Sequence, residues 1–117
     1  MHAIKGATSC PVPAAQVAAW AARFSRTALD LGAGDGRFVR KLADQHEDRA
    51  VIALDLCAAN YKAASRAADQ NALFLVADAL HLPPEWSGLA DDISVNFPWG
   101  SLLRGFLGCH ERLSFFP

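Results

Sequence analysis

The chain has 117 residues, of which 52% are hydrophobic and 20% are charged, and its formal net charge is −1. This composition excludes a disordered chain, which lacks the apolar residues needed to offset the entropy of ordering. The balance of 11 lysine and arginine residues against 12 aspartate and glutamate residues argues against a strongly basic nucleic-acid-binding module. No apolar run approaches the roughly 18–20 residues of a membrane span, and the N-terminus lacks a signal-peptide pattern, so we expect a cytoplasmic protein.

The cysteines and histidines predict neither a disulfide framework nor a metal site. Cys10, Cys57 and Cys109 are odd in number and lack the spacing of a zinc motif, which indicates reduced thiols. The four histidines show no ligand spacing and no paired nucleophile. We therefore predict that the protein uses no metal and no catalytic histidine.

Strands and helices alternate along the sequence, and we expect them to form a single domain over residues 1–117. Apolar residues three and four apart predict helices, and short apolar runs bounded by turn residues predict strands. In chain order, the predicted elements are a helix at 17–24, a strand at 27–31, a helix at 35–46, a strand at 50–55, an alanine-rich helix at 58–70 that stops at Asn71, strands at 73–78 and 92–97, and a helix at 102–110.

This alternation predicts an α/β fold with a Rossmann-like, mainly parallel sheet and helices on both faces. Strands buried on both faces are continuous apolar runs, as these are. Ligands of such sheets bind beyond the carboxyl ends of the strands. The candidate functional residues fall at that edge.

A glycine-rich loop follows the first of these strands and opens a helix. Gly32, Gly34 and Gly36 allow a sharp turn and a close approach of a ligand to the main chain. A tight turn at a strand–helix junction is the alternative interpretation. A dinucleotide-binding loop needs glycine at position 37, where this chain has Arg37.

Two carboxylates flank the loop and indicate which ligand it suits. Asp30 and Asp35 would repel a pyrophosphate in a partly dry site. They suit a ligand with cationic groups, and S-adenosylmethionine carries an ammonium and a sulfonium. We therefore predict S-adenosylmethionine as the cofactor.

The next two strands also end on carboxylates. Asp55 stands where a carboxylate accepts hydrogen bonds from ribose hydroxyls. Asp78 and Ala79 are placed to border the adenine. Ala33 and Leu56, next to these groups, complete the expected cofactor-binding set. Ordinary strand-end carboxylates are the alternative interpretation of Asp55 and Asp78.

The last constellation is Asn96-Phe97-Pro98-Trp99. Asn96 and a carbonyl held by the following proline offer acceptors for the hydrogens of an amine, and Trp99 offers a stacking face for a flat base. The predicted catalytic set is therefore Asn96, Pro98 and Trp99, with Asn96 also near the cofactor. A buried tryptophan after a strand-ending proline is the alternative.

Three stretches together resemble class I S-adenosylmethionine-dependent methyltransferases. They are Asp30-Leu-Gly-Ala-Gly-Asp-Gly-Arg37, the acidic strand end at Asp55, and Phe97-Pro-Trp-Gly-Ser-Leu-Leu-Arg104. More narrowly, they resemble the aminoglycoside-resistance enzymes that methylate N1 of adenine 1408 in 16S ribosomal RNA. The resemblance runs from about residue 4 to residue 108.

The resemblance implies roles for individual residues. Cofactor contacts are implied for five of them: Asp30, Gly32, Gly34, Asp55 and Asp78. Trp99 would stack on a flipped adenine in a pocket shaped by Pro98, in 16S rRNA within the 30S subunit. Neutral adenine N1 already has a lone pair, so no general base is needed, and catalysis would consist of base extrusion, alignment and stacking.

The resemblance also implies a seven-stranded sheet, of which the sequence predicts four strands in the order 3-2-1-4. We therefore expect a C-terminally truncated domain whose fourth strand, Asp92–Phe97, is an apolar edge. An unpaired edge is a template for another chain, which predicts a homodimer joined there.

Other functions stay open at this point. The chain is expected to be a non-catalytic S-adenosylmethionine-binding module, or a methyltransferase of a small amine, if it is not an RNA methyltransferase. A dinucleotide-binding half-domain is the remaining alternative, and Arg37 and Asp35 argue against it.

Overall fold

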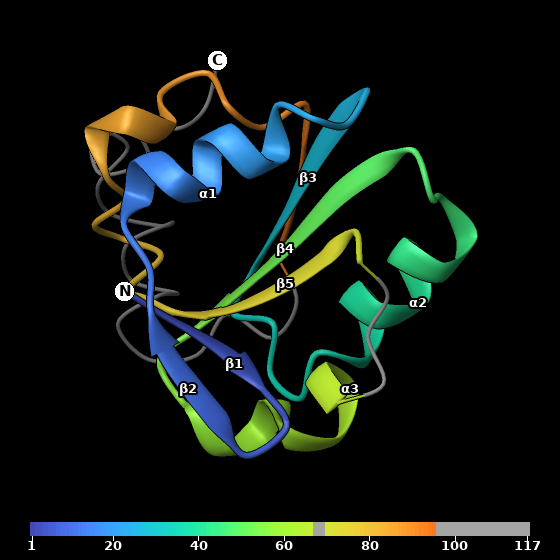
Figure 1. The fold of residues 1–117 in the computed structure, drawn as a ribbon, viewed down its shortest axis with the longest axis vertical. Helices are drawn as coiled ribbons and strands as arrows, with labels where there is room; N and C mark the ends of the chain where they lie inside the picture. The colour runs from blue at the N-terminus through green and yellow to red at the C-terminus, as the bar shows by residue number, and fades with distance from the viewer. Residues whose placement is uncertain (67–69, 96–117) are drawn as a thin grey trace.

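The computed structural model describes residues 1–66 and 70–95 (Figure 1). The elements are strands β1 (His2–Lys5), β2 (Thr8–Pro11), β3 (Arg26–Leu31), β4 (Arg49–Asp55), β5 (Ala72–Val76) and β6 (Asp92–Val95), helices α1 (Ala14–Ala21), α2 (Arg37–Gln45) and α3 (Lys62–Arg66), and 3-10 turns η1 (Ala58–Tyr61) and η2 (Pro84–Trp86). The predicted site residues Asn96, Pro98 and Trp99 and the predicted helix at 102–110 lie outside the described residues.

Six strands form one sheet in the order β2-β1-β5-β4-β3-β6. The strands β5, β4, β3 and β6 are parallel, which confirms the predicted α/β class. They are the third, second, first and fourth of the predicted strands, so the predicted order 3-2-1-4 is also confirmed. Strand β4 lies between β5 and β3 and is buried at every position from Ala50 to Leu54, as expected for a strand covered on both faces.

An antiparallel hairpin of β1 and β2 extends the sheet beyond β5, and the sequence analysis did not predict it. All four residues of β2 are exposed, so the hairpin carries no alternation of apolar and polar residues. Its turn is held by Gly6, whose main-chain N–H donates to Ser65 Oγ at 2.9 Å.

Two apolar clusters cover the two faces of the sheet, as predicted. On one face, Val17 of α1 and Trp86 of η2 pack against Leu29 and Ile52. Trp86 is 1% exposed and its Nε1–H donates to the carbonyl of Ala14 at 2.9 Å, which fixes η2 to α1. The other cluster contains Val39 and Ala43 of α2, Tyr61, Ala64 of α3 and Phe74.

Several element boundaries differ from the predictions for local reasons. Helix α2 begins at Arg37 rather than at residue 35, because Gly36 before it has φ +81°. The alanine-rich segment starts as a 3-10 turn at Ala58 and becomes α-helical only at Lys62. Strand β5 ends at Val76, before the predicted end at Asp78.

A buried side chain hydrogen-bonds main-chain groups near the amino ends of the parallel strands. Asn71 is buried, and its Nδ2 donates to the carbonyls of Ala43 at 3.0 Å, His46 at 3.0 Å and Arg49 at 2.9 Å. Asn71 was predicted to stop the helix before it, and that prediction is not tested because residues 67–69 are not described; its side chain joins the end of α2 to the start of β4. Within residues 1–66 and 70–95, no helix is long and apolar enough to cross a membrane.

Candidate functional site

The glycine loop after β3 is hydrogen-bonded to the main chain of β4. The N–H groups of Gly32 and Ala33 both donate to the carbonyl of Leu54, at 2.9 and 3.0 Å. Three glycines of the loop have positive φ, with +67° at Gly32, +61° at Gly34 and +81° at Gly36. Residues with a Cβ rarely adopt this conformation, so the loop needs glycine here.

Gly34 and Gly36 meet different surroundings. A Cβ on Gly36 would lie 2.6 Å from Cε1 of the buried Phe74 ring, so this glycine lets the loop rest directly on the core. A Cβ on Gly34 would meet nothing within 4 Å. The loop therefore presents an open side at Gly34, where a bound molecule can approach the main chain.

Asp55 links the end of β4 to the open side of the loop. Its Oδ2 accepts the N–H of Gly34 at 2.9 Å, and its Oδ1 accepts the N–H of Cys57 at 2.9 Å. Each carboxylate oxygen can accept two hydrogen bonds, so both oxygens keep capacity for hydroxyl donors. Asp55 can thus hold the loop and a ligand at the same time.

Asp30 lies at the end of β3, beneath the loop, and is 1% exposed. Its Oδ1 accepts the hydroxyl of Ser94 at 2.8 Å, and the two residues are direct partners in the β3–β6 register. Ser94 was not predicted from the sequence, although a hydroxyl within the otherwise apolar stretch Ile93–Val95 was the available signal. A carboxylate in this position places acceptor oxygens next to the loop.

Asp78 follows β5 on the same edge of the sheet. Its Oδ1 accepts the N–H of Leu80 at 2.9 Å, and its Oδ2 lies 2.6 Å from Nδ1 of His81. The main chain joins this turn to the neighbouring strand, because the N–H of Ala77 donates to the carbonyl of Asp55 at 3.1 Å. Ala79 is buried in the core, so its side chain faces away from solvent.

Tyr61 supports the site from below and was not predicted from the sequence. Its hydroxyl donates to the carbonyl of Leu75 at 3.1 Å, and its ring meets Phe74 edge-on with centroids 5.4 Å apart. Burial raises the pKa of Tyr61 well above its usual value, and the charges of Asp55 and Asp30 add to this rise. The phenol therefore stays neutral under ordinary conditions.

Most of the predicted cofactor residues come together at the carboxyl edge of β3, β4 and β5. They are Asp30, Gly32, Ala33, Gly34, Asp55, Leu56, Asp78 and Ala79. Leu56 is 67% exposed, which is unusual for a large apolar side chain and leaves an apolar surface beside Asp55. Carboxylates, free acceptor capacity, exposed main chain and an apolar surface suit a ligand with hydroxyls, a flat ring and positive charge.

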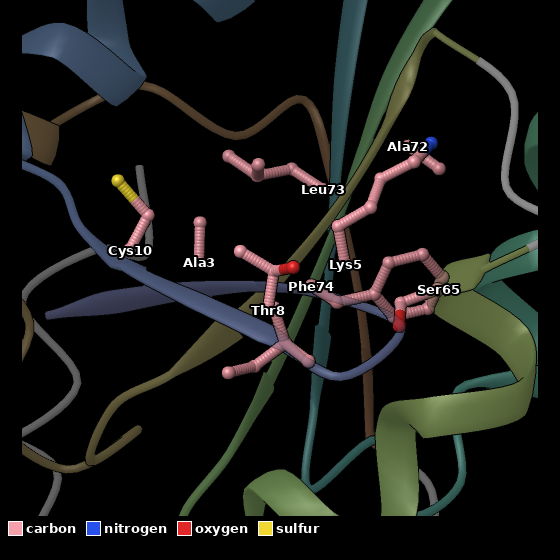
Figure 2. A pocket seen from close by; sticks show the side chains of 9 residues that line it. Ala3, Lys5, Thr8, Cys10, Ser65, Ala72, Leu73 and Phe74 are labelled. Atoms are coloured by element: carbon pink, nitrogen blue, oxygen red, sulfur yellow. The ribbon is translucent and has the colours of Figure 1, made fainter.

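A cavity of about 170 Å³ lies elsewhere, between the β1–β2 hairpin and β5 (Figure 2). Its lining includes Lys5, Thr8, Cys10, Ser65 and Leu73. These residues belong to the hairpin, to α3 and to the amino half of β5, away from the ends of β3 and β4. The cavity is therefore separate from the carboxyl-edge site.

In the described part of the chain, no three His, Cys, Asp or Glu side chains are grouped to hold a metal ion.

Comparison with known proteins identifies similar chains. The profile of the family described as NpmA: 16S rRNA (adenine(1408)-N(1))-methyltransferase matches residues 2–114. A 16S rRNA (adenine(1408)-N(1))-methyltransferase from Escherichia coli is 38% identical over 90 residues, which cover 70% of this chain and 41% of that protein. One from Streptoalloteichus tenebrarius is 41% identical over 99 residues, which cover 78% of this chain and 45% of that protein.

The fold is also similar to a solved structure. The crystal structure of the aminoglycoside resistance methyltransferase NpmB1 matches with a TM-score of 0.83 and 35% identity, over 97% of this chain and 59% of that chain. The chain thus spans less than half the length of both of these curated methyltransferases.

Proposed function

The chain belongs to the 16S rRNA (adenine(1408)-N(1))-methyltransferase family, and we propose that it binds S-adenosylmethionine and transfers its methyl group to N1 of an adenine in 16S rRNA. The observation that carries the proposal is the hydrogen bond of 2.9 Å from Gly34 to Asp55. It joins the open side of the glycine loop to a carboxylate that can still accept hydroxyls. We propose that residues 1–117 act as one domain.

The carboxyl-edge residues fit the donor in a consistent way. Asp55 would accept the ribose hydroxyls, and Leu56 would cover one face of the adenine. Asp78, with its carboxylate 41% exposed, would accept from the exocyclic amine. Asp30 would supply negative charge beneath the loop, favouring the ammonium and sulfonium of the donor over a pyrophosphate.

The chemistry asks for alignment rather than for proton transfer. The donor supplies a methyl group as an electrophile, and the lone pair of adenine N1 forms the new bond to carbon while the bond to sulfur breaks. We propose that Trp99 stacks on the adenine, with Pro98 and Asn96 beside it, so that the ring is held in line with the methyl group. No residue of this chain is assigned as a general base.

Calorimetry tests the donor site. We expect S-adenosylmethionine to bind and NAD not to bind. Asp55→Ala should weaken donor binding about 30-fold, since about 2 kcal/mol of hydrogen bonding to a charged group is lost. Asp44→Ala, an exposed carboxylate on α2, is the matched control and should leave the affinity unchanged. An unmodified chain that binds no donor at millimolar concentration refutes the proposal.

Methyl transfer to 30S subunits separates the proposed function from its alternatives. We expect Trp99→Ala to abolish transfer while sparing donor binding. A non-catalytic binding module would bind the donor and show no transfer to 30S subunits. A methyltransferase of small amines would accept an amine in place of the subunits.

We also propose a homodimer joined at the edge formed by residues 92–97. Within the described residues β6 pairs only with β3, and Val95 at its end is 37% exposed. Such an edge can pair with a second copy of the chain. Light scattering at tens of micromolar should give the mass of a dimer. A monomer at this concentration would refute the proposed dimer.

A further inference from the structure

Helix α2 carries a basic face that the donor site does not use. Arg37, Phe38, Arg40 and Lys41 are all exposed and form the first turns of the helix. We call these four residues the α2 basic face. Phe38 is 46% exposed, so nearly half of a large aromatic side chain is open to solvent on the same helix as three exposed cations.

Arg37 is the first residue of the helix. The amino end of a helix carries partial positive charge, which disfavours a cation in the first turn by a few tenths to about 1 kcal/mol. The first turn of α2 contains no acidic residue. The stability of the helix therefore does not explain the placement of Arg37.

Little negative charge neutralises the α2 basic face. Arg37 pairs with Asp35 at 2.7 Å, in a contact where the side chains are 86% and 51% exposed. Among the described residues, neither Arg40 nor Lys41 has a carboxylate within 4.0 Å. Asp44 is the single carboxylate of α2, and the neighbouring segment Ala58–Arg66 has Lys62 and Arg66 and none. Helix α2 and the segment Ala58–Arg66 together are therefore positively charged, although the whole chain has a net charge of −1.

The α2 basic face begins directly beside the candidate site. Helix α2 starts at Arg37, directly after Gly36, the last glycine of the loop that follows the carboxyl end of β3. The ribbon of Figure 1 shows this helix beside the parallel strands. A polyanion bound there would lie next to the proposed donor site. Exposed cations with an aromatic side chain among them are the groups that bind phosphates and stack on unpaired bases.

We infer that the α2 basic face contacts the sugar–phosphate backbone of the RNA substrate, with Arg40 and Lys41 on phosphates and Phe38 against a base. This inference rests on the proposed function and assigns part of its substrate contact. Contacts of this kind give affinity rather than sequence selection, because phosphates are the same at every nucleotide. They would hold the RNA while the residues of the site select the base.

Binding to purified 30S subunits at several salt concentrations tests the inference. The variant Arg40→Gln/Lys41→Gln removes two charges from α2. We expect it to weaken binding roughly tenfold at 0.1 M salt. The plot of the logarithm of the association constant against the logarithm of the salt concentration should become shallower, with a slope smaller in magnitude by about 2. The control Lys5→Gln/Arg23→Gln also removes two charges, one on the hairpin and one before β3, and should change the slope little.

Calorimetry with S-adenosylmethionine separates this inference from the proposed function. We expect the α2 variant to bind the donor as the unmodified chain does. Equal salt slopes for the α2 variant and the unmodified chain overturn the inference and leave the proposed function standing. An unmodified chain that does not bind 30S subunits overturns the inference even if it binds the donor. Loss of donor binding in the unmodified chain refutes the proposed function instead.

Discussion

The two ends of the parallel strands use polar residues in opposite ways. At the amino ends, Asn71 donates to three carbonyls and the carboxylate of Asp91 accepts the N–H of Thr27 at 2.8 Å. At the carboxyl ends, Asp55 accepts two N–H groups but retains acceptor capacity on both oxygens. The amino ends therefore complete the protein's own hydrogen bonding, whereas Asp55 at the carboxyl ends can accept further hydrogen bonds.

This difference predicts that stability and donor binding separate along the strands. Substitutions at the amino ends should lower the free energy of unfolding and leave donor affinity unchanged. Substitutions on the open side of the carboxyl ends should lower donor affinity and have a smaller effect on the free energy of unfolding. Four changes test the comparison, beginning with the one that we expect to be most damaging.

Gly36→Ala should destabilise the protein by about 3 kcal/mol, from the positive φ and from overpacking against Phe74. Gly34→Ala is the matched control, because its φ is also positive but its Cβ meets nothing within 4 Å. It should cost only about 1 kcal/mol of stability and weaken donor binding. Urea unfolding and calorimetry measure the two effects. Equal destabilisation by both substitutions would contradict the assigned contact with Phe74.

Asn71→Ala should lower the free energy of unfolding by about 2 kcal/mol, because buried carbonyls at the end of α2 lose their donor. Donor affinity, measured where both proteins are folded, should not change. Gln45→Ala, at an exposed position of α2, is the control and should be nearly neutral. A parallel loss of donor affinity in Asn71→Ala would show that the two ends are coupled.

Tyr61 makes stability depend on alkaline pH. Its pKa is raised in the folded protein, mainly by burial, so folding keeps the phenol protonated. The stabilisation is complete below the unfolded pKa of about 10 and is lost above it, at about 1.4 kcal/mol per pH unit. Tyr61→Phe should remove this part of the pH dependence. Urea unfolding between pH 9 and 11, values chosen to bracket about 10, compares the two proteins. Equal slopes would contradict the prediction.

Asp92→Asn should have the smallest effect. Arg26 lowers the pKa of Asp92 through a hydrogen bond of 2.6 Å, but both side chains are nearly half exposed, so solvent screens the pair. A lowered pKa stabilises the fold above the unfolded pKa of Asp92, and the stabilisation is lost as pH falls through the folded value. Thermal unfolding at low salt should show a small difference at neutral pH that disappears in acid or high salt. A difference that persists in acid would assign it to packing.

The sequence predicted the parallel part of the fold because each strand is an apolar run bounded by turn residues. Four strands and their order were confirmed. The β1–β2 hairpin was missed, since an exposed strand such as Thr8–Pro11 has no apolar pattern and gains its place from pairing alone. The 3-10 start at Ala58 was missed for a similar reason, because alanine-rich sequence suits both helix types.

The site was predictable where a residue type has a local requirement. A turn that needs positive φ needs glycine, so the three closely spaced glycines from Gly32 to Gly36 predicted this loop, and all three have positive φ in the structure. Ser94 and Tyr61 were not found, because their roles depend on neighbours 64 residues and 14 residues away along the chain. Asn96, Pro98 and Trp99 remain predictions, since they lie outside the described residues.

The hydrogen bond between Asp55 and Gly34 has a consequence for turnover. Because it holds the loop in place without a ligand, the methyl donor and its demethylated product would, under the proposed function, meet the same preorganised ribose-binding site. The two molecules differ only in one methyl group and in the positive charge on sulfur. Any preference for fresh donor over spent product would therefore depend on contacts with the methyl group and on attraction of the positive charge to Asp30 beneath the loop, and high salt should weaken the electrostatic part only slightly, since buried charges are poorly screened.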